Sequence, residues 1–138
     1  MLFFPFDSLV SDDGDGNLTY DRAFNSANLR KIFHGLYTNG VAMSDNSGAL
    51  QVIPYSGMHC TVKSGFAIIE GAMGIQESDL VVVVDAAHTT YTRIDSIMVR
   101  LNTNLTGRCI TIEYVKGAET SAPSAPAVVR SGGIYDLR

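Results

Sequence analysis

Short runs in which apolar and polar residues alternate dominate the chain from residue 48 onward, with glycine, serine, asparagine or aspartate between the runs. This pattern is typical of antiparallel strands that bury one face. It predicts a mainly β fold, an antiparallel β-sandwich (jelly-roll-like) with an N-terminal α-helix. The strands are expected near residues 50–55, 58–63, 66–70, 80–84, 95–101, 109–115 and 134–137.

Short polar segments are predicted to connect these strands. Ser56-Gly57 and Ser64-Gly65 each stand between two alternating runs, as the two-residue turns of β-hairpins do. A longer hairpin is predicted at residues 102–107. The glycine-rich segment 71–74 falls between strand patterns, and we interpret it as a turn or a bulge.

Alternation also assigns side chains to faces. Ile97, Val99 and Leu101 form one apolar row. Arg93 and Asp95 stand at the entry end of the same face, where the two side chains can form an ion pair. We therefore expect this strand to contribute one side of the core.

Two further segments have patterns of their own. Residues 80–84 are apolar at every position, so we expect one face under an opposing sheet and the other under the helix or a partner chain. Residues 118–127 contain alanine, serine and two prolines, and they predict an extended connection along the surface.

A helix is predicted over about residues 20–36, with Thr19 as its N-cap. Its apolar residues form two stripes on nearly opposite sides. The stripes are Tyr20, Ala23, Phe24 and Ala27, and Leu29, Ile32, Phe33 and Leu36. The helix therefore either breaks near residues 25–28 or contacts apolar surface on both sides. We divide the chain into an N-terminal arm with an acidic loop (1–19) and a single domain (20–138) that holds the helix and a β-sandwich over about 48–138.

Length and composition fit one globular domain. The chain has 138 residues, of which 46% are hydrophobic, enough for a sizeable core without disulfides or a structural metal. The 10 basic residues are scattered and the net charge is −4, which argues against a nucleic-acid surface because phosphate binding requires clustered cations. No stretch approaches the roughly 20 apolar residues of a membrane span, and the N-terminus lacks the cationic region of a signal peptide.

The two cysteines are predicted to be free thiols. Cys60 points inward with Met58 and Val62, whereas Cys109 points outward with Thr111. Side chains on opposite faces of strands cannot bridge. Free thiols favour synthesis in a reducing compartment.

Candidate metal sites are weak. Residues 13–17 place oxygen ligands at alternate positions, as a calcium loop does, but Leu18 stands where that loop needs glycine and Phe24 where it needs glutamate. An acidic, solvated loop is the favoured interpretation. Asp85 and His88 are better explained by a hydrogen-bonded turn. We expect no metal and no cofactor.

Catalysis is not expected either. Four carboxylates lie close in sequence, and they leave hydrolysis of a polysaccharide open as a third hypothesis. These are Glu70, Glu77, Asp79 and Asp85. Sequence spacing does not give the geometry that a glycosidase needs, and no nucleophile elbow or phosphate loop is present. The chain is therefore predicted not to be an enzyme.

Apolar residues near the N-terminus predict an interaction surface, because they exceed what one small sandwich can cover. The residues predicted to contact other copies or a hub protein are Phe3, Phe4, Phe6, Tyr20, Phe24, Leu29, Ile32 and Phe33. A carbohydrate-binding module is the alternative, with Tyr55 and Tyr91 as stacking faces for a saccharide.

An ordered set of segments resembles a known family. The segments are Tyr20-Asp21, Asn39-Gly40-Val41, Gly57-Met58, 62–71, Asp79-Leu80, 85–87, 93–101, 115–117, 125–126 and 134–137. In this order they resemble the baseplate and receptor-binding proteins of long-tailed phages that infect Gram-positive hosts. The resemblance implies a virion structural protein that forms the shoulder or anchoring domain of a host-recognition device. It also implies a homotrimer at the phage tail tip, synthesised in the bacterial cytoplasm and bound to a tail hub or distal tail protein. The host surface that it binds does not follow from the resemblance, and a cell-wall saccharide is a candidate partner.

Overall fold

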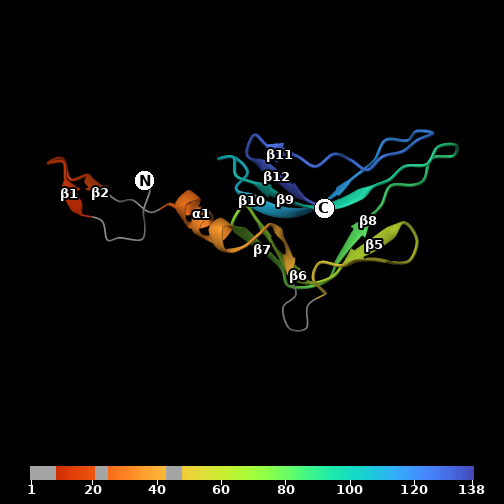
Figure 1. Cartoon of the computed structure of the whole chain (residues 1–138), viewed down its shortest axis with the longest axis horizontal. Coiled ribbons are helices and arrows are strands. Elements are labelled where there is room, and N and C mark those ends of the chain that lie inside the picture. Colours follow the sequence, from red (N-terminus) through yellow and green to blue (C-terminus); the bar gives the residue numbers. More distant parts are fainter. Residues whose placement is uncertain (1–8, 21–24, 43–47) are drawn as a thin grey trace.

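The computed structural model describes residues 9–20, 25–42 and 48–138. The fold is mainly β, with one short helix and several small antiparallel sheets (Figure 1). The elements are β1 (Val10–Asp12), β2 (Leu18–Tyr20), α1 (Ser26–Leu36), β3 (Gly40–Ala42), β4 (Val52–Pro54), β5 (His59–Val62), β6 (Gly65–Ile69), β7 (Ala72–Gln76), β8 (Leu80–Val83), β9 (Ser96–Asn102), β10 (Cys109–Val115), β11 (Arg130–Ser131) and β12 (Ile134–Leu137).

These strands form four antiparallel sheets, with orders β1-β2, β10-β9-β12-β11, β3-β6-β7 and β4-β5-β8. All seven predicted strands are present, and those at 109–115 and 134–137 have the predicted bounds. The strands β1, β2, β3, β7 and β11 were not predicted. Four of them have only two or three residues, too few for alternation to be recognisable in the sequence.

The Ser64-Gly65 link is not a hairpin, and that prediction is wrong. β5 pairs with β4 and β8, whereas β6 pairs with β3 and β7. The chain thus passes from one sheet into the next at this point, and it returns between β7 and β8. The β6–β7 pairing ends at Gly65↔Gln76, and the β5–β8 pairing begins next to it at Val62↔Leu80. The strands β5, β6, β7 and β8 therefore form a single two-stranded ribbon that bends between the two pairings.

The bend of the ribbon is held by Asp79. One carboxylate oxygen accepts a hydrogen bond from the Ser64 backbone N–H at 3.0 Å, and the other forms an ion pair with Lys63. The Lys63 N–H in turn donates to the Gln51 carbonyl oxygen at 2.9 Å. Backbone groups that leave the regular ladder at the bend therefore still have partners.

The core lies between the ribbon and the β9-containing sheet. Ala67 and Ile69 from β6 form a buried cluster with Val99 and Leu101 from β9. Partly buried side chains surround this cluster: Leu50, Ala72, Ile110, Ile112, Tyr135 and Leu137. The predicted apolar row on β9 is confirmed, because Leu101, Val99 and Ile97 lie opposite Ile110, Ile112 and Tyr114 of β10.

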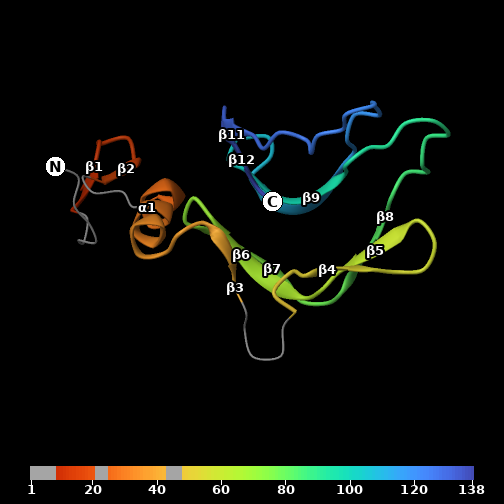
Figure 2. The same ribbon diagram turned by 45° about the vertical axis from the view of Figure 1, so that its right-hand side comes forward.

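The other face of β9 is also covered. Met98 is 1% exposed and Ser96 is buried, although the sequence pattern assigned burial only to the odd positions. The segment between β10 and β11 runs along this side of the sheet (Figure 2). It is attached to β12, because the Asp136 N–H donates to the Val129 carbonyl oxygen at 2.8 Å and Arg138 donates to the Pro126 carbonyl oxygen at 3.0 Å.

Strand β8 differs from the prediction of two covered faces. Leu80 and Val82 are half-buried, but Val81 is 50% exposed and Val83 is 65% exposed. The helix α1 lies near the opposite end of the ribbon (Figure 1). The expectation that the helix covers this strand is therefore wrong, and cover by a partner chain stays a prediction.

The helix starts at Ser26, and the predicted start at residue 20 is wrong. Its N-cap is Asn25, whose side-chain oxygen accepts a hydrogen bond from the Asn28 N–H at 3.0 Å. Thr19, the predicted N-cap, lies in β2, where its hydroxyl contacts that of Ser11 at 2.7 Å. Thr19 is therefore held by strand pairing and does not cap the helix. The predicted alternative, a break of the helix near residues 25–28, lies close to the observed helix start.

Candidate functional site

An apolar groove separates α1 from the β6–β7 hairpin. No residue of α1 is buried, and Leu29, Phe33 and Tyr37 are exposed large hydrophobic side chains. The groove has a volume of about 280 Å³. Its lining is Ser26, Leu29, Arg30, Phe33, Tyr37, Ile68, Gly71, Ala72 and Met73. Most of these side chains are apolar, so the groove can take an apolar side chain from another molecule.

Because residue 71 is glycine, α1 can pack directly against the turn of the β6–β7 hairpin. A Cβ atom at this position would lie 1.9 Å from the Arg30 carbonyl oxygen. Gly71 also has φ of +72°, and Glu70 before it has φ of +49°. Positive φ at both central residues is the pattern of a type I′ turn, which suits a two-residue hairpin. The side chain of Asn39 supports the turn by accepting from the Glu70 N–H at 2.8 Å.

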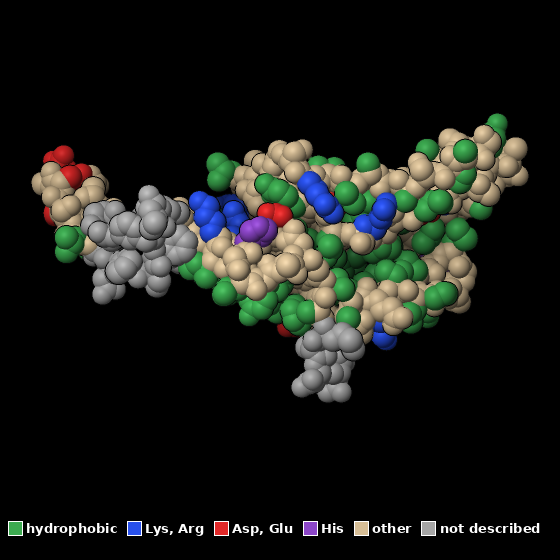
Figure 3. All heavy atoms as spheres, viewed as in Figure 1, with side chains coloured by type: hydrophobic (Ala, Val, Ile, Leu, Met, Phe, Trp, Pro, Cys, Tyr) green, Lys and Arg blue, Asp and Glu red, His purple; other side chains and the backbone are tan. Residues whose placement is uncertain are grey.

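The apolar groove continues onto the outer face of the hairpin. Met73 and Ile75 of β7 are exposed, and they lie opposite Ile68 and Phe66 of β6. Figure 3 shows apolar side chains along this side of the molecule, beside the helix. Together the groove and these β7 side chains make an apolar surface, which we call the helix–hairpin surface and define by Leu29, Phe33, Tyr37, Met73 and Ile75.

The structure brings only some of the predicted interface residues to this surface. Leu29 and Phe33 lie on it, and Ile32 is a half-buried residue of α1 outside the groove lining. Tyr20 lies in β2, so its predicted position on the helix, in the stripe opposite Leu29 and Phe33, is wrong. Phe3, Phe4, Phe6 and Phe24 lie outside the described residues.

Tyr37, Met73 and Ile75 of the helix–hairpin surface were not predicted from the sequence pattern. Met73 and Ile75 do alternate with their neighbours, but Gly71 and Gly74 made the segment resemble a turn. Alternation across a glycine was the signal that could have revealed this strand.

The other side of α1 is basic. Arg30, Lys31 and His34 lie around a cleft with Glu70 and Tyr135, and His34 Nδ1 lies 3.9 Å from a Glu70 oxygen. An apolar side and a charged side are typical of a helix that lies at the boundary between protein and solvent.

In the part of the chain that is described, no helix is long and apolar enough to cross a membrane.

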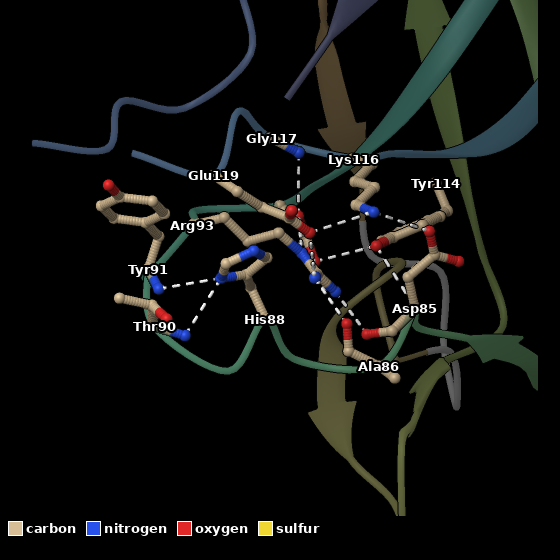
Figure 4. Close-up of polar contacts among 11 residues, drawn as sticks. Asp85, Ala86, His88, Thr90, Tyr91, Arg93, Tyr114, Lys116, Gly117 and Glu119 are labelled. Atoms are coloured by element: carbon tan, nitrogen blue, oxygen red, sulfur yellow. Dashed lines mark hydrogen bonds and ion pairs between the residues drawn. The ribbon is translucent and has the colours of Figure 1, made fainter. Parts of the chain in front are cut away.

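A second candidate site is the polar cluster around Arg93 (Figure 4). Arg93 Nε lies 3.0 Å from both oxygens of Asp95, which confirms the predicted pair. Arg93 Nη1 donates to Glu119 at 3.0 Å and to the Ala86 carbonyl oxygen at 2.6 Å, while Nη2 donates to the Asp85 carbonyl oxygen. The Arg93 side chain is only 7% exposed. Its guanidinium group thus joins the loop after β8 to the segment after β10.

Asp95 is the acceptor at the centre of this cluster. It accepts from the Gly117 N–H and from the Tyr114 hydroxyl, each at 2.8 Å. Partial burial raises the pKa of Asp95, but hydrogen bonds from Gly117, Tyr114 and Arg93 outweigh it and leave the pKa below its ordinary value. Burial and the hydrogen bond to Asp95 raise the pKa of Tyr114. The carboxylate therefore stays ionised and the phenol neutral near pH 7.

The Arg93 cluster is a network of ion pairs and hydrogen bonds that joins the two segments. Lys116 completes it by contacting Glu119 at 3.1 Å and Asp85 at 3.4 Å. Each charged group thus faces a group of opposite charge. Among the residues that the structure describes, no buried side-chain polar atom lacks a partner. The charged groups of the cluster thus neutralise one another.

The two tyrosines predicted to contact a saccharide lie in different loops. Tyr55 is exposed in the β4–β5 turn and has its ring at 90° to that of His59, with centroids 6.4 Å apart. Tyr91 is exposed in the loop between β8 and β9 and stacks on His88 at 5.4 Å. Both loops lie at the end of the molecule away from α1 (Figures 1 and 2).

The acidic loop closes the β1–β2 hairpin. Asp12 Oδ1 accepts from the Gly14 N–H at 2.9 Å, and Asp13 Oδ1 accepts from the Asp15 N–H at 2.9 Å. The hydrogen bond from the Asp15 N–H, together with one from the Asn17 side chain, lowers the pKa of Asp13. The carboxylates thus bind the backbone of their own turn. Within residues 9–20, 25–42 and 48–138, no group of three or more His, Cys, Asp or Glu side chains is placed to hold a metal ion.

Comparison with known proteins finds no relative of this chain. No protein family model, no curated protein and no solved structure matches the chain.

Proposed function

We propose that the protein is a phage virion structural protein, a tail baseplate component that anchors, or forms the shoulder of, a host receptor-binding device. The ordered set of segments from Tyr20 to residue 137 supports this proposal through its resemblance to that family. A mainly β fold with one helix near its N-terminal end is compatible with it. No catalysis, cofactor or metal forms part of the proposal.

The observation that carries the proposal is the helix–hairpin surface. Its five side chains are large, apolar and exposed, and they lie on two adjoining elements. A monomeric protein rarely leaves such a contiguous apolar surface in water, because burying it is favourable by about 25 cal/mol per Å². The proposed occupants are other copies in a homotrimer, or a tail hub or distal tail protein at the tip of the phage tail.

The proposal includes a β-sandwich of the jelly-roll type as the rigid part of the subunit. In this arrangement the bent ribbon forms one layer and the sheet of β9, β10, β11 and β12 forms the other. The buried cluster of Ala67, Ile69, Val99 and Leu101 supports it, since the two pairs come from opposite sides of the core. Such a rigid mount would hold α1 in place for assembly.

Changing the groove tests the proposal. We expect the wild-type chain to have a mass in light scattering that is a multiple of three chains at micromolar concentration. The double variant Leu29→Ser, Phe33→Ser should lose the three-fold contact, because it removes two apolar anchors. The matched control is Leu105→Ser, which changes an exposed leucine of the β9–β10 turn and should keep the wild-type mass.

A direct binding experiment addresses the role in the virion. The chain is expected to bind the hub or distal tail protein encoded beside it, and the double variant should bind more weakly than Leu105→Ser. A monomeric wild-type chain that does not bind either tail protein would contradict the proposal.

A carbohydrate-binding module that contacts the cell-wall saccharide is the second candidate. Its specific support is that Tyr55 and Tyr91 are both exposed and each ring is oriented by a histidine, because fixed aromatic faces lose little entropy when a ligand stacks on them. Binding to a glycan array that is lost in Tyr91→Ala would favour this function. An array without binding, together with tight binding to the hub protein, would favour the first.

A further inference from the structure

Strand β8 is an apolar strand at the edge of a sheet. Within the described chain it pairs with β5 alone, so its other edge has no strand beside it. Residues 80–84 are one leucine followed by four valines. Protein sheets commonly protect such an edge with a lysine, a proline or a bulge, because an open apolar edge pairs with other strands. Residues 80–84 contain no lysine or proline.

The hydrogen bonds of the β5–β8 ladder show which backbone groups face the open edge. The Val84 N–H donates to the Met58 carbonyl oxygen at 2.8 Å. Since bonded and non-bonded pairs alternate in an antiparallel ladder, the bonds to β5 are made by Val84, Val82 and Leu80. The N–H and C=O groups of Val81 and Val83 therefore point away from β5, toward the open edge.

The same two valines also have exposed side chains. Val81 and Val83 are the alternate positions of β8 that lie on its outer face, and both are exposed. An incoming strand would satisfy their backbone groups and cover their side chains at once. This coincidence distinguishes β8 from β10, one of the two edge strands of the β9-containing sheet, whose outer side chains include the polar Thr111 and Glu113.

We propose that β8 of a second copy of this chain occupies this edge, antiparallel, with the two-fold axis passing through Val82. In that register Val81 of one copy lies opposite Val83 of the other, so the outward backbone groups of both form hydrogen bonds. The exposed valine side chains meet across the axis on one face. The strand is thus complementary to itself.

The charges at the ends of β8 are compatible with a second copy at this edge. In this register Asp79 of one copy lies opposite Asp85 of the other. Each aspartate already has a cation from its own chain, because Lys63 pairs with Asp79 and Lys116 lies 3.4 Å from Asp85. The two acidic ends can therefore approach without an uncompensated charge, and the sheet would continue across six strands.

This inference does not depend on the proposed function, because it uses β8 and not the helix–hairpin surface. If both contacts form and the two-fold axes cross the three-fold axis at right angles, they close an assembly of six copies. Loss of the groove contact should then leave dimers, and loss of the β8 contact should leave trimers. The two proposals can thus fail separately.

Disulfide trapping tests the register. In the background Cys60→Ser, Cys109→Ser, the variant Val82→Cys places two cysteines on the two-fold axis in a non-hydrogen-bonded pair. Such a pair has a Cα–Cα distance of about 4.5 Å, within the range for a disulfide. Oxidation should give a covalent dimer. The matched control is Val41→Cys in the same background, an exposed valine of β3 that should stay monomeric on a non-reducing gel.

A second variant tests the contact without a covalent bond. Val83→Lys places a charge at the open edge and should weaken self-association by at least about tenfold in sedimentation experiments. Circular dichroism should show an unchanged fold, because the side chain at this position is exposed. Equal cross-linking of Val82→Cys and Val41→Cys, or unchanged association of Val83→Lys, would overturn the proposal. Cross-linking of Val82→Cys that occurs only when a tail protein is present would also overturn the proposal.

Discussion

The β9-containing sheet and the bent ribbon have equally apolar strands but differ in how completely the chain covers them. In β9, Met98 on one face and Val99 on the other are both buried, because the segment before β11 covers the face turned away from the core. In β8 and β7 the outer valine, methionine and isoleucine side chains stay exposed. In this subunit the β9-containing layer is thus covered by its own chain on both faces, whereas the outer side of the other layer is exposed and is where we propose contacts with other molecules.

Polar groups follow the same division. Arg100 lies on the covered outer face of β9 and binds both oxygens of Asp136, at 2.7 and 3.0 Å, and one oxygen of Glu113 at 2.8 Å. The Asp136 side chain is 0% exposed and also accepts from the Val129 N–H at 3.0 Å. On the ribbon, the Lys63–Asp79 pair is partly open to solvent. We expect the covered pair to matter for stability far more than the open one.

The largest effect is expected from Asp136→Asn. This change removes the buried one of the two negative charges that pair with Arg100, and it replaces one accepting carboxylate oxygen by an amide NH2 group that can only donate. The free energy of unfolding should therefore fall by about 3 kcal/mol. Chemical denaturation measures this value. Asp79→Asn is the matched control on the ribbon, and its loss should be clearly smaller. Similar losses for the two variants would contradict the contrast between the layers.

The next effect is expected from Gly71→Ala, which brings a Cβ atom against the Arg30 carbonyl oxygen and forces alanine to a positive φ. The cost should be about 2 kcal/mol in unfolding free energy, with α1 displaced from the hairpin. Gly35→Ala is the control, since this helical position has open space around it, and it should stabilise the protein by up to about 1 kcal/mol. Equal destabilisation by both changes would show that the close approach at Gly71 has no role.

A smaller effect is the loss of unfolding free energy in acid. The hydrogen bond and charge of Arg100 lower the pKa of Asp136 below its ordinary value of 3.8, so the folded chain holds this proton less tightly than the unfolded chain. The resulting stability is fully present above about pH 4 and is lost as the pH falls through the lowered pKa. Unfolding free energies measured between pH 2 and 6 should show this decline. The decline should be shallower in Asp136→Asn, and an identical slope would count against the assignment.

The smallest effect on stability is expected at the helix–hairpin surface. Leu29→Ser and Phe33→Ser should each change the unfolding free energy of the isolated subunit by only about 0.5 kcal/mol, because both side chains are exposed there. Denaturation in dilute solution tests this. A loss comparable to that of Asp136→Asn would mean that these residues serve the subunit's own core and not an interface.

Local patterns predicted much of the fold. The strands at 109–115 and 134–137 agree with the structure because their alternation is regular and each has one face in the core. The Arg93–Asp95 pair could be predicted because the two residues are close in sequence and opposite in charge, although both lie in the segment before β9 and not in the strand. These are features that neighbouring residues determine.

The rest depends on distant residues. Arg100 and Asp136 are separated by 36 positions, and no spacing in the sequence links them. The covering of Met98 was missed because the segment over it has no apolar period of its own. The helix start was misplaced because Thr19 pairs with Ser11 in a hairpin. At the candidate site, Leu29 and Phe33 were found from helical periodicity, whereas Met73 and Ile75 required the position of the hairpin.

The bend in the ribbon also bears on the order of folding. Closing the single turn at Glu70-Gly71 brings β6 beside β7, and the next pairs along the same two segments are those of β5 and β8. Strand pairing in the ribbon can therefore start at this turn and extend pair by pair, through contacts between residues that are close in sequence. The pairing of β9 with β12 must close a far longer loop, which carries a greater entropic cost. We expect amide hydrogens of the ribbon to gain protection from exchange first during refolding, before those of the sheet that later covers them.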